Sequence, residues 1–297
     1  MAKTYNNLYL DIRQQLLGGG IAMASLEARE IMRFVTGKDR MAIIRDYHLY
    51  VPAEQETRAT ALLHRRLDGE PIAYIVGQWE FFGLTLEVNS HVLIPRIDTE
   101  VLAGRAIALA KQIGGTRVLD LCAGSGNVGL AVAAYVPDCR VVMAELSEAA
   151  LSVARENVRQ YDLISRVTCA RADALSPTPA ALGLFDMIVC NPPYIETGRM
   201  DTLDDGVRRY EPRLALDGGP DGLRFFRAVA FGWRGSLKPD GYLLFECGQG
   251  QAPAVRDILY KAAYGQVETL TDTQDIERVV TGAPVWNDAI KDGVAEI

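Results

Sequence analysis

Three glycines follow a short apolar stretch of the chain and precede a helical pattern. Gly124, Gly126 and Gly129 satisfy the spacing G-x-G-x-x-G within the segment VLDLCAGSGNVGLAVA. Glycine in such a loop lets a ligand approach backbone N–H groups at the start of a helix. An acidic residue, Glu145, ends the next apolar stretch and could accept hydrogen bonds from ribose hydroxyls. The pattern predicts an adenosine-containing cofactor, and it leaves open whether this is NAD or S-adenosylmethionine.

A second chemical motif, Asn191-Pro192-Pro193-Tyr194, directly follows the apolar segment FDMIVC. The two prolines have no N–H to donate and fix φ, so the loop is stiff and holds the Asn191 amide rigidly. The Asn191 side-chain oxygen and the Pro192 carbonyl could accept the two hydrogens of a planar nitrogen group, while Tyr194 covers its face. The motif therefore predicts an amide or an exocyclic base amine as the acceptor. An NAD-dependent oxidoreductase would leave it unexplained.

Strands alternate with helices from about residue 98 onward, and these elements must position both motifs. The expected strands span residues 117–122, 140–145, 166–170, 185–190, 242–246, 267–271 and 277–281. The expected helices span residues 128–135, 147–161, 223–237 and 251–263, and Ser147 is expected to cap the second of them. Such alternation implies an α/β fold, a doubly wound and mostly parallel sheet with its ligand beyond the carboxyl ends of the strands. The last two strands have no helix between them, so we expect an antiparallel edge.

The first 71 residues show helical periodicity. Leu8, Ile12 and Leu16 form one apolar stripe, and two further helices are expected, one capped by Ser25 and one beginning at Pro52. Residues 72–95 carry aromatic and β-branched runs with interspersed glycines, and this pattern predicts a β-hairpin between a small helical domain and the sheet.

Composition excludes several classes of protein. The chain has 297 residues, 49% of them hydrophobic and 23% charged, which is typical of a globular protein with a substantial core. Five scattered cysteines and three separated histidines form no metal-binding pattern. Residues 81–297 carry the whole net charge of −7, which argues against stable nucleic-acid binding. The first residues contain no apolar signal region, and the apolar stretches of the sequence are too short to span a membrane, so a cytoplasmic location is expected.

The motifs DLCAGSG, Glu145 and NPPY together resemble the class I S-adenosylmethionine-dependent methyltransferases that modify amino or amide nitrogens. Three further stretches narrow the likeness, namely residues 70–102 with the segment IPRIDTE, residues 211–226 (EPRLALDGGPDGLRFF) and residues 272–280 (DTQDIERVV). They resemble the family that methylates the glutamine of the Gly-Gly-Gln motif in peptide chain release factors. A glutamine methyltransferase for a ribosomal protein and a nucleic-acid amino-methyltransferase remain alternatives.

The resemblance implies a seven-stranded, Rossmann-like catalytic domain and assigns its site residues. It implies a substrate-recognition domain over residues 1–71, a hairpin linker over 72–97 and a catalytic domain over 98–297. The implied catalytic residues are those of the NPPY motif, Asn191, Pro192, Pro193 and Tyr194. The implied S-adenosylmethionine contacts are Asp120, Cys122, Ala123, Gly124, Ser125, Gly126, Glu145, Asp173, Ala174 and Asn191. The implied protein partner is a release factor.

The chain departs from the family pattern at two positions, because Cys122 stands where glycine is frequent and Ile97 where proline is frequent. At least one of the side chains of Asp98, Thr99 and Glu100 is expected to cap the helix that follows them. Glu211 and Arg213 are expected either to form an ion pair in a loop or to contact the substrate. Glu246 lies at a strand end near the site, although the chemistry requires no obvious general base.

Overall fold

The computed structural model describes residues 2–286 and divides into two compact units. Among these residues, one unit holds 2–78 together with 204–210, and the other holds 79–203 and 211–286. The helical unit thus extends past the predicted boundary at residue 71 and takes in a short segment from far along the sequence. Residues 287–297 of the predicted catalytic domain lie outside the described residues.

The first unit is built of helices. They are α1 (Tyr5–Gly18), α2 (Ala24–Thr36), α3 (Arg40–Arg45), α4 (Ala53–Leu67), α5 (Ile72–Val76) and α9 (Asp205–Tyr210). The predicted stripe of Leu8, Ile12 and Leu16 is buried in its core. Helix α9 joins this unit because the Arg209 side chain and the Tyr210 hydroxyl each donate a hydrogen bond to the Asp68 carbonyl.

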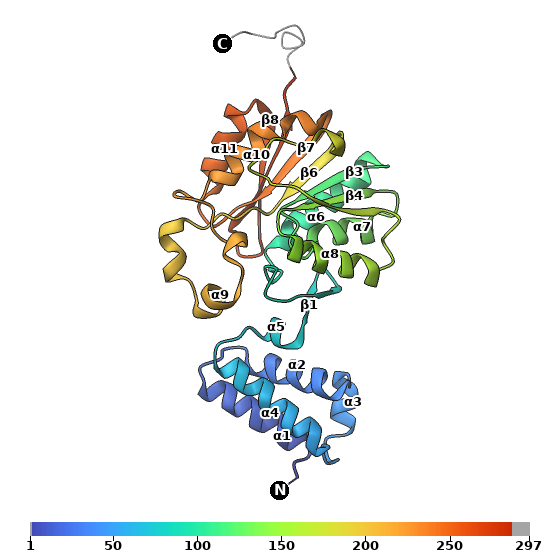
Figure 1. The fold of residues 1–297 in the computed structure, drawn as a ribbon, viewed down its shortest axis with the longest axis vertical. Helices are drawn as coiled ribbons and strands as arrows, with labels where there is room; N and C mark the ends of the chain where they lie inside the picture. Colours follow the sequence, from blue (N-terminus) through green and yellow to red (C-terminus); the bar gives the residue numbers. More distant parts are fainter. Residues whose placement is uncertain (1, 287–297) are drawn as a thin grey trace. The chain divides into compact units, whose positions relative to one another are not determined.

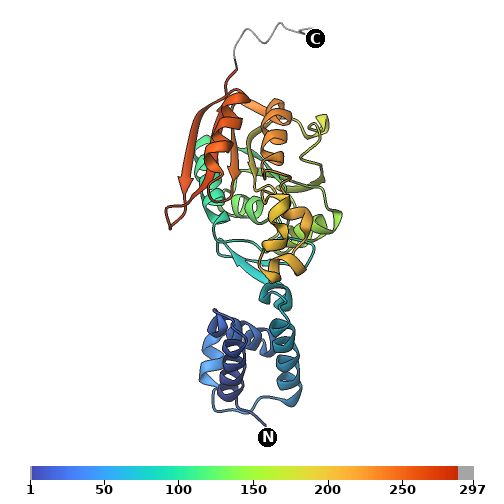
Figure 2. The same cartoon turned by 90° about the vertical axis from the view of Figure 1, so that its left-hand side faces the viewer.

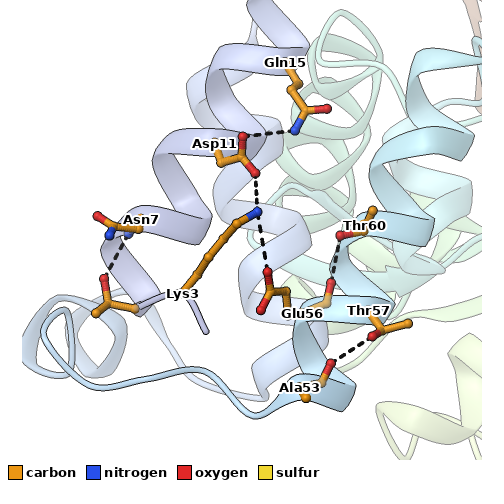
Figure 3. Close-up of polar contacts among 9 residues, drawn as sticks. Lys3, Asn7, Asp11, Gln15, Ala53, Glu56, Thr57 and Thr60 are labelled. Carbon is orange, nitrogen blue, oxygen red and sulfur yellow. Dashed lines mark hydrogen bonds and ion pairs between the residues drawn. The ribbon is translucent and has the colours of Figure 1, made fainter. Parts of the chain in front are cut away.

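Figure 3 shows how Lys3 ties the beginning of the chain to two of these helices. Its ammonium group lies 2.6 Å from Asp11 on α1 and 3.5 Å from Glu56 on α4. The hydrogen bond to Asp11 is the main cause of the raised pKa of Lys3, and the same bond lowers the pKa of Asp11. Because the three groups are partly exposed, we expect a modest contribution to stability.

Two sequence predictions for the helical unit were wrong. Ser25 does not cap α2, which begins at Ala24; its hydroxyl instead accepts a hydrogen bond from Arg13. Residues 72–76 form α5 and not a strand, although Ile and Val favour strands. Pro71 precedes the helix, Gly77 ends it in a left-handed conformation, and Ile72, Ile75 and Val76 are buried together. Tertiary burial therefore overrides the β-propensity of this segment.

The hairpin itself is shorter than expected. Strands β1 (Gln78–Phe81) and β2 (Leu84–Glu87) form a two-stranded sheet, and Phe82 and Gly83 both adopt positive φ in the connecting turn. Two left-handed residues match the twist of paired strands. Buried Asn157 ties the hairpin to the glycine loop, because its side chain bonds to the Glu87 backbone and donates to the Ser125 carbonyl.

The second unit contains the predicted doubly wound sheet (Figure 1). Its seven strands lie in the order β5-β4-β3-β6-β7-β9-β8. They are β3 (Arg117–Leu121), β4 (Arg140–Glu145), β5 (Val167–Arg171), β6 (Phe185–Cys190), β7 (Leu237–Glu246), β8 (Tyr264–Thr271) and β9 (Glu277–Pro284). The first five are parallel, and β9 runs antiparallel to both β7 and β8. The predicted antiparallel pairing of the last two strands is confirmed.

Helices cover both faces of this sheet (Figures 1 and 2). One core contains residues of α6 (Thr99–Ile113), α7 (Asn127–Tyr135) and α8 (Glu148–Gln160). The opposite core contains residues of α10 (Arg224–Gly232) and α11 (Ala252–Lys261). Neighbouring strand residues alternate between the two, since Val118 packs in the first and Leu119 in the second. The predicted Ser147 cap of α8 is confirmed by its bond from the Ala150 N–H.

Strand register brings the chemical motifs to one edge. Leu121 pairs with both Ala144 and Cys190, and Cys190 pairs with Phe245. The residues that follow these positions therefore emerge together at the carboxyl ends of four adjacent parallel strands. They include the glycine loop, Glu145, Asn191 and Glu246.

Candidate active site

A cavity of about 550 Å³ lies at this edge, within the second unit. This volume suits a small-molecule ligand. Eight predicted cofactor contacts line it, namely Cys122, Ala123, Gly124, Ser125, Glu145, Asp173, Ala174 and Asn191, and so does Pro193 of the NPPY motif. The lining does not include Asp120, Gly126, Pro192 or Tyr194. The cavity therefore brings together the two motifs that the sequence separates by more than sixty residues.

The glycines of the loop serve different purposes. At Gly124 an added Cβ would meet nothing within 4 Å, so this backbone is open to a ligand. At Gly126 a Cβ would lie 2.8 Å from the Met143 sulfur, and at Gly129 it would lie 2.9 Å from an Asp120 oxygen. Those two glycines allow α7 to pack closely on the sheet. Only Gly124 has the open position that the sequence analysis expected of the loop.

Two acidic residues hold the glycine loop from different sides. Glu145 accepts hydrogen bonds from the backbone N–H groups of Gly124, at 3.1 Å, and Ser147, at 2.9 Å. Its carboxylate lines the cavity and keeps lone pairs for further donors. Asp120 is buried and accepts a 2.8 Å bond from the Gly129 N–H, and burial raises its pKa to about 7. Asp120 therefore supports the glycine loop through Gly129 and does not line the cavity.

The Asp173 carboxylate is occupied by its own turn. It accepts hydrogen bonds from the Leu175 N–H and the Ser176 hydroxyl, while the Ala174 carbonyl accepts one from the buried Trp233 indole. These bonds fix the far wall of the cavity. They leave room for a further donor to Asp173, since each carboxylate oxygen has two acceptor positions.

The NPPY loop is enclosed by glycines from two distant segments. A Cβ at Gly218 would lie 2.7 Å from the Tyr194 Cα, and a Cβ at Gly248 would lie 3.2 Å from the Tyr194 ring. Ile195 exchanges backbone hydrogen bonds with residues 216 and 218, and the Gln251 side chain donates to the Tyr194 carbonyl. Burial raises the pKa of the Tyr194 hydroxyl. This role of the glycines could not be predicted, because no local pattern in the sequence relates them to Tyr194.

The expectation that a side chain from residues 98–100 caps α6 was wrong. Asp98 occupies the cap position without a capping bond and pairs instead with Arg278 at 2.8 Å. Buried Thr99 accepts a 3.2 Å hydrogen bond from the Asn191 amide nitrogen, and Glu100 accepts one from the Phe82 N–H. Each side chain has a partner elsewhere in the fold, and Thr99 lines the cavity.

Glu211 and Arg213 do not form an ion pair with each other. The Glu211 carboxylate is buried, pairs with Arg96 at 2.5 Å and accepts a hydrogen bond from the Ile94 N–H. Arg213 pairs with Asp217 at 3.1 Å. Arg96 and Arg213 both line the cavity. The Glu211–Arg96 pair thus joins the segment IPRIDTE to the loop that covers the NPPY motif.

Glu246 ends β7 beside Asn191 and is 2% exposed. Its Oε2 atom has no hydrogen-bond partner among the described residues. Burial raises the pKa of the carboxyl to about 7, although hydrogen bonds from Thr99 and Asn191 oppose the shift. Glu246 was expected near the site, at a strand end, but its sequence context indicated no function for it.

Within residues 2–286, no group of His, Cys, Asp and Glu side chains could hold a metal ion. In the same part of the chain, no helix combines the length and the apolar character needed to cross a membrane.

Comparison with known proteins identifies close relatives. Residues 7–77 match the model of the PrmC N-terminal domain, and residues 96–208 match that of the methyltransferase small domain. A release factor glutamine methyltransferase from Caulobacter vibrioides is 36% identical over 95% of this chain and 97% of its own length. Proteins of the same name from Geobacter sulfurreducens and Neisseria gonorrhoeae are 37% and 38% identical, over 91% and 88% of this chain and 93% of each relative.

Two solved structures share the fold. The catalytic domain of hMettl16, solved with an RNA hairpin of the MAT2A 3′UTR, superimposes with a TM-score of 0.54 over 79% of this chain and 82% of that domain, at 15% identity. A methyltransferase from Pyrococcus furiosus gives 0.50 over 76% and 100%, at 18% identity. Both likenesses confirm the fold class that the sequence predicted.

Proposed function

This chain belongs to the release factor glutamine methyltransferase family, and we propose that it methylates the side-chain nitrogen of the glutamine in the Gly-Gly-Gln motif of peptide chain release factors, with S-adenosylmethionine as the methyl donor. The observation that carries the proposal is the position of Asn191. Its amide donates to Thr99 and stands at the wall of the cavity that the open glycine loop also lines.

The cavity residues fit S-adenosylmethionine. Gly124 offers an open backbone, the Glu145 carboxylate suits the ribose hydroxyls, and Asp173 with Ala174 suits the adenine. Asp120 supports the loop from behind, so we expect its effect on cofactor affinity to be indirect. Cys122 lines the cavity and adopts φ of 61°, a left-handed conformation that favours glycine. When bound, S-adenosylmethionine supplies a methyl group that its positively charged sulfur already activates.

The residues of the NPPY loop would orient the acceptor amide. Because the Asn191 nitrogen donates to Thr99, its Oδ1 is the atom left to accept a hydrogen from the glutamine –NH2 group. The Pro192 carbonyl would accept the second hydrogen, and the stiffness of the double proline keeps both acceptors fixed. Positioning of this kind can lower a barrier by roughly 7–11 kcal/mol in favourable cases. The displaced proton can pass to water, so no strong base is required.

Choice of substrate requires a second surface, since glutamine amides occur in every protein. We assign this recognition to the helical unit, which corresponds to the predicted domain of residues 1–71, while residues 72–97 connect it to the catalytic residues 98–297. The match of residues 7–77 to the PrmC N-terminal domain supports a shared role with the family. Exposed apolar side chains on this unit, including Leu26, Met41 and Ile44, offer contact area for a protein partner.

Intact-mass analysis tests the function directly. Purified enzyme and S-adenosylmethionine should add one methyl group to a release factor, and peptide mapping should place it on the Gly-Gly-Gln glutamine. A release factor in which alanine replaces that glutamine is the matched control and should remain unmodified. Methylation of a ribosomal protein or a nucleic acid, with an unmodified release factor, would contradict the proposal and favour the corresponding alternative.

A further inference from the structure

The carboxyl group of Glu246 is buried next to the amide that we assign to substrate binding. Register places Asn191 and Glu246 side by side, because the residues before them, Cys190 and Phe245, are paired across β6 and β7. The Thr99 hydroxyl and the Asn191 side chain lower the pKa of the Glu246 carboxyl, against the larger effect of burial. Thr99 in turn accepts from the Asn191 nitrogen at 3.2 Å. The three side chains therefore form one polar cluster, in which Thr99 and Asn191 line the cavity and Glu246 does not.

We propose that Glu246 is a positioning residue that fixes the orientation of the Asn191 amide. This inference rests on the function proposed above and adds a residue to it. An asparagine amide can rotate by half a turn and exchange its oxygen with its nitrogen. An ionised carboxylate only accepts hydrogen bonds, so it stabilises the orientation in which the –NH2 group faces Glu246 and Thr99. The oxygen of Asn191 then faces the cavity and the substrate.

A purely structural role explains Glu246 less well than the positioning role does. A buried carboxylate with an unpartnered oxygen costs stability, and an apolar side chain at the end of a core strand would avoid this cost. The nearby cation, Arg278, does not neutralise the Glu246 carboxylate either. Arg278 on β9 pairs with Asp98 and Asp272, at 2.8 Å each. The buried carboxylate of Glu246 is therefore better explained by a role in the site.

Protonation of Glu246 should release the Asn191 amide. The charged and titratable groups around Glu246 are Asp98 at the start of α6, Arg278 on β9, Tyr194 in the NPPY loop and Cys247 in its own strand end. Burial dominates these effects and places the pKa of Glu246 at about 7. Below this value the carboxyl gains an O–H that can donate to the Asn191 oxygen, which favours the reversed orientation. Methyl transfer should then decline as the pH falls through about 7.

Glu246→Gln tests the proposal, because it keeps the shape and removes the acceptor-only carboxylate. We expect kcat on intact release factor to fall roughly ten- to a hundredfold, the scale of a misplaced reacting group. The KM for release factor and the affinity for S-adenosylhomocysteine, measured by calorimetry, should change little. The acid decline of kcat seen in the wild type should disappear. Glu268→Gln, which removes an exposed carboxylate from β8, is the matched control and should leave kcat and its pH profile unchanged.

A second pair of variants tests the same cluster without touching Glu246. Thr99→Val should lower kcat and Thr99→Ser should restore it, because serine keeps the hydroxyl. A spectroscopic measurement does not depend on activity. The side-chain ¹⁵N–¹H signals of Asn191, assigned by their loss in Asn191→Ala, should shift with an apparent pKa near 7 in the wild type and not in Glu246→Gln.

The outcomes separate this inference from the proposed function. An enzyme that methylates release factor, yet keeps its kcat and its acid decline in Glu246→Gln, would refute the positioning role and assign the decline to another group such as Asp120. Asn191 signals that do not titrate in the wild type would refute it as well. Failure of the wild-type enzyme to methylate any release factor would instead refute the proposed function, and the Asn191 signals would still decide the orientation.

Discussion

The glycines that enclose the NPPY loop allow steric contact to be separated from backbone strain. Gly218 has no positive φ, but an added Cβ would lie 2.7 Å from the Tyr194 Cα and 2.8 Å from the Pro193 carbonyl oxygen. Gly115, in the loop before β3, has φ of 57° and nothing within 4 Å of its Cβ position. Gly222 combines both features, since its φ is 69° and its Cβ would collide with the Tyr194 carbonyl. Alanine at these positions therefore tests each effect alone and then together.

The expected changes in the free energy of unfolding follow from these contacts. Gly115→Ala should cost roughly 1–2 kcal/mol, the penalty of a left-handed L-residue. Gly218→Ala should cost a similar amount, about 1–3 kcal/mol, because the clash is with backbone that cannot move freely. Gly222→Ala should cost more than either. Urea denaturation followed by circular dichroism measures all three.

The order of the three variants in kcat should differ from their order in the free energy of unfolding. Gly218→Ala and Gly222→Ala displace the loop that carries Asn191, so kcat should fall by up to roughly a hundredfold. Gly115→Ala should keep the wild-type kcat, because its strain lies at the amino ends of the strands. The assay is steady-state methylation of release factor with both release factor and cofactor at saturating concentration. Equal kcat values for Gly115→Ala and Gly218→Ala would refute the claim that the glycines position the NPPY loop.

Three further predictions follow from the same geometry. S-adenosylhomocysteine should raise the melting temperature, because a ligand at a hundred times its Kd adds about 2.7 kcal/mol, and stabilisation by NAD alone would contradict the cofactor assignment. Asn191→Ala should abolish most turnover and leave calorimetric cofactor affinity nearly intact, and Asn191→Asp should retain at most partial activity; a wild-type rate in Asn191→Ala would remove the central claim. The raised pKa of Glu246, about 7, means that the folded state keeps a proton which the unfolded chain releases nearer 4.5, so the free energy of unfolding falls as the pH rises across this window. Glu246→Gln should therefore be more stable than the wild type at about pH 8, with a smaller difference at about pH 5, as measured by urea denaturation.

A further prediction concerns how the enzyme selects its substrate. A short peptide around Gly-Gly-Gln should be a poor substrate in kcat/KM, because remote contacts supply the binding energy that positions the reacting group. Removal of residues 1–93 would also remove Asp68, whose carbonyl accepts hydrogen bonds from Arg209 and Tyr210 of α9. Charge substitutions of exposed apolar residues, such as Met41→Glu and Ile44→Glu, therefore test the helical unit more cleanly. An unchanged KM for intact release factor would argue that this surface does not bind the substrate.

The sequence predicted the parts of the fold that depend on local periodicity. Alternating apolar strands and amphipathic helices identified the parallel sheet, and the lack of a helical pattern between residues 271 and 277 identified its antiparallel edge. Short helices could not be predicted in this way. Helices α3 and α9 have six residues each, too few to show a period, and α5 was mistaken for a strand because β-branched residues form its buried face.

The site was predictable only where its residues are neighbours in sequence. The glycine loop and the NPPY motif could be found in this way, since each carries its chemistry within a few residues. The partners that hold them are distant. Asn191 bonds to Thr99 across 92 positions, and Arg96 pairs with Glu211 across 115. Helix-capping rules misled the interpretation of residues 98–100, because the same side chains that cap helices also bond across the fold.

The segments with no periodic signal converge on one loop in the structure. IPRIDTE supplies Thr99, which bonds to the Asn191 amide, and Arg96, which pairs with Glu211. EPRLALDGGPDG supplies Glu211 and the glycine that packs against the Tyr194 backbone. ECGQG begins with Glu246 and supplies Gly248. All three segments contact the NPPY loop or the cluster around Asn191. Under the function proposed above, an amide acceptor that needs no base depends on its alignment, and alignment requires distant parts of the chain to contact the same few atoms.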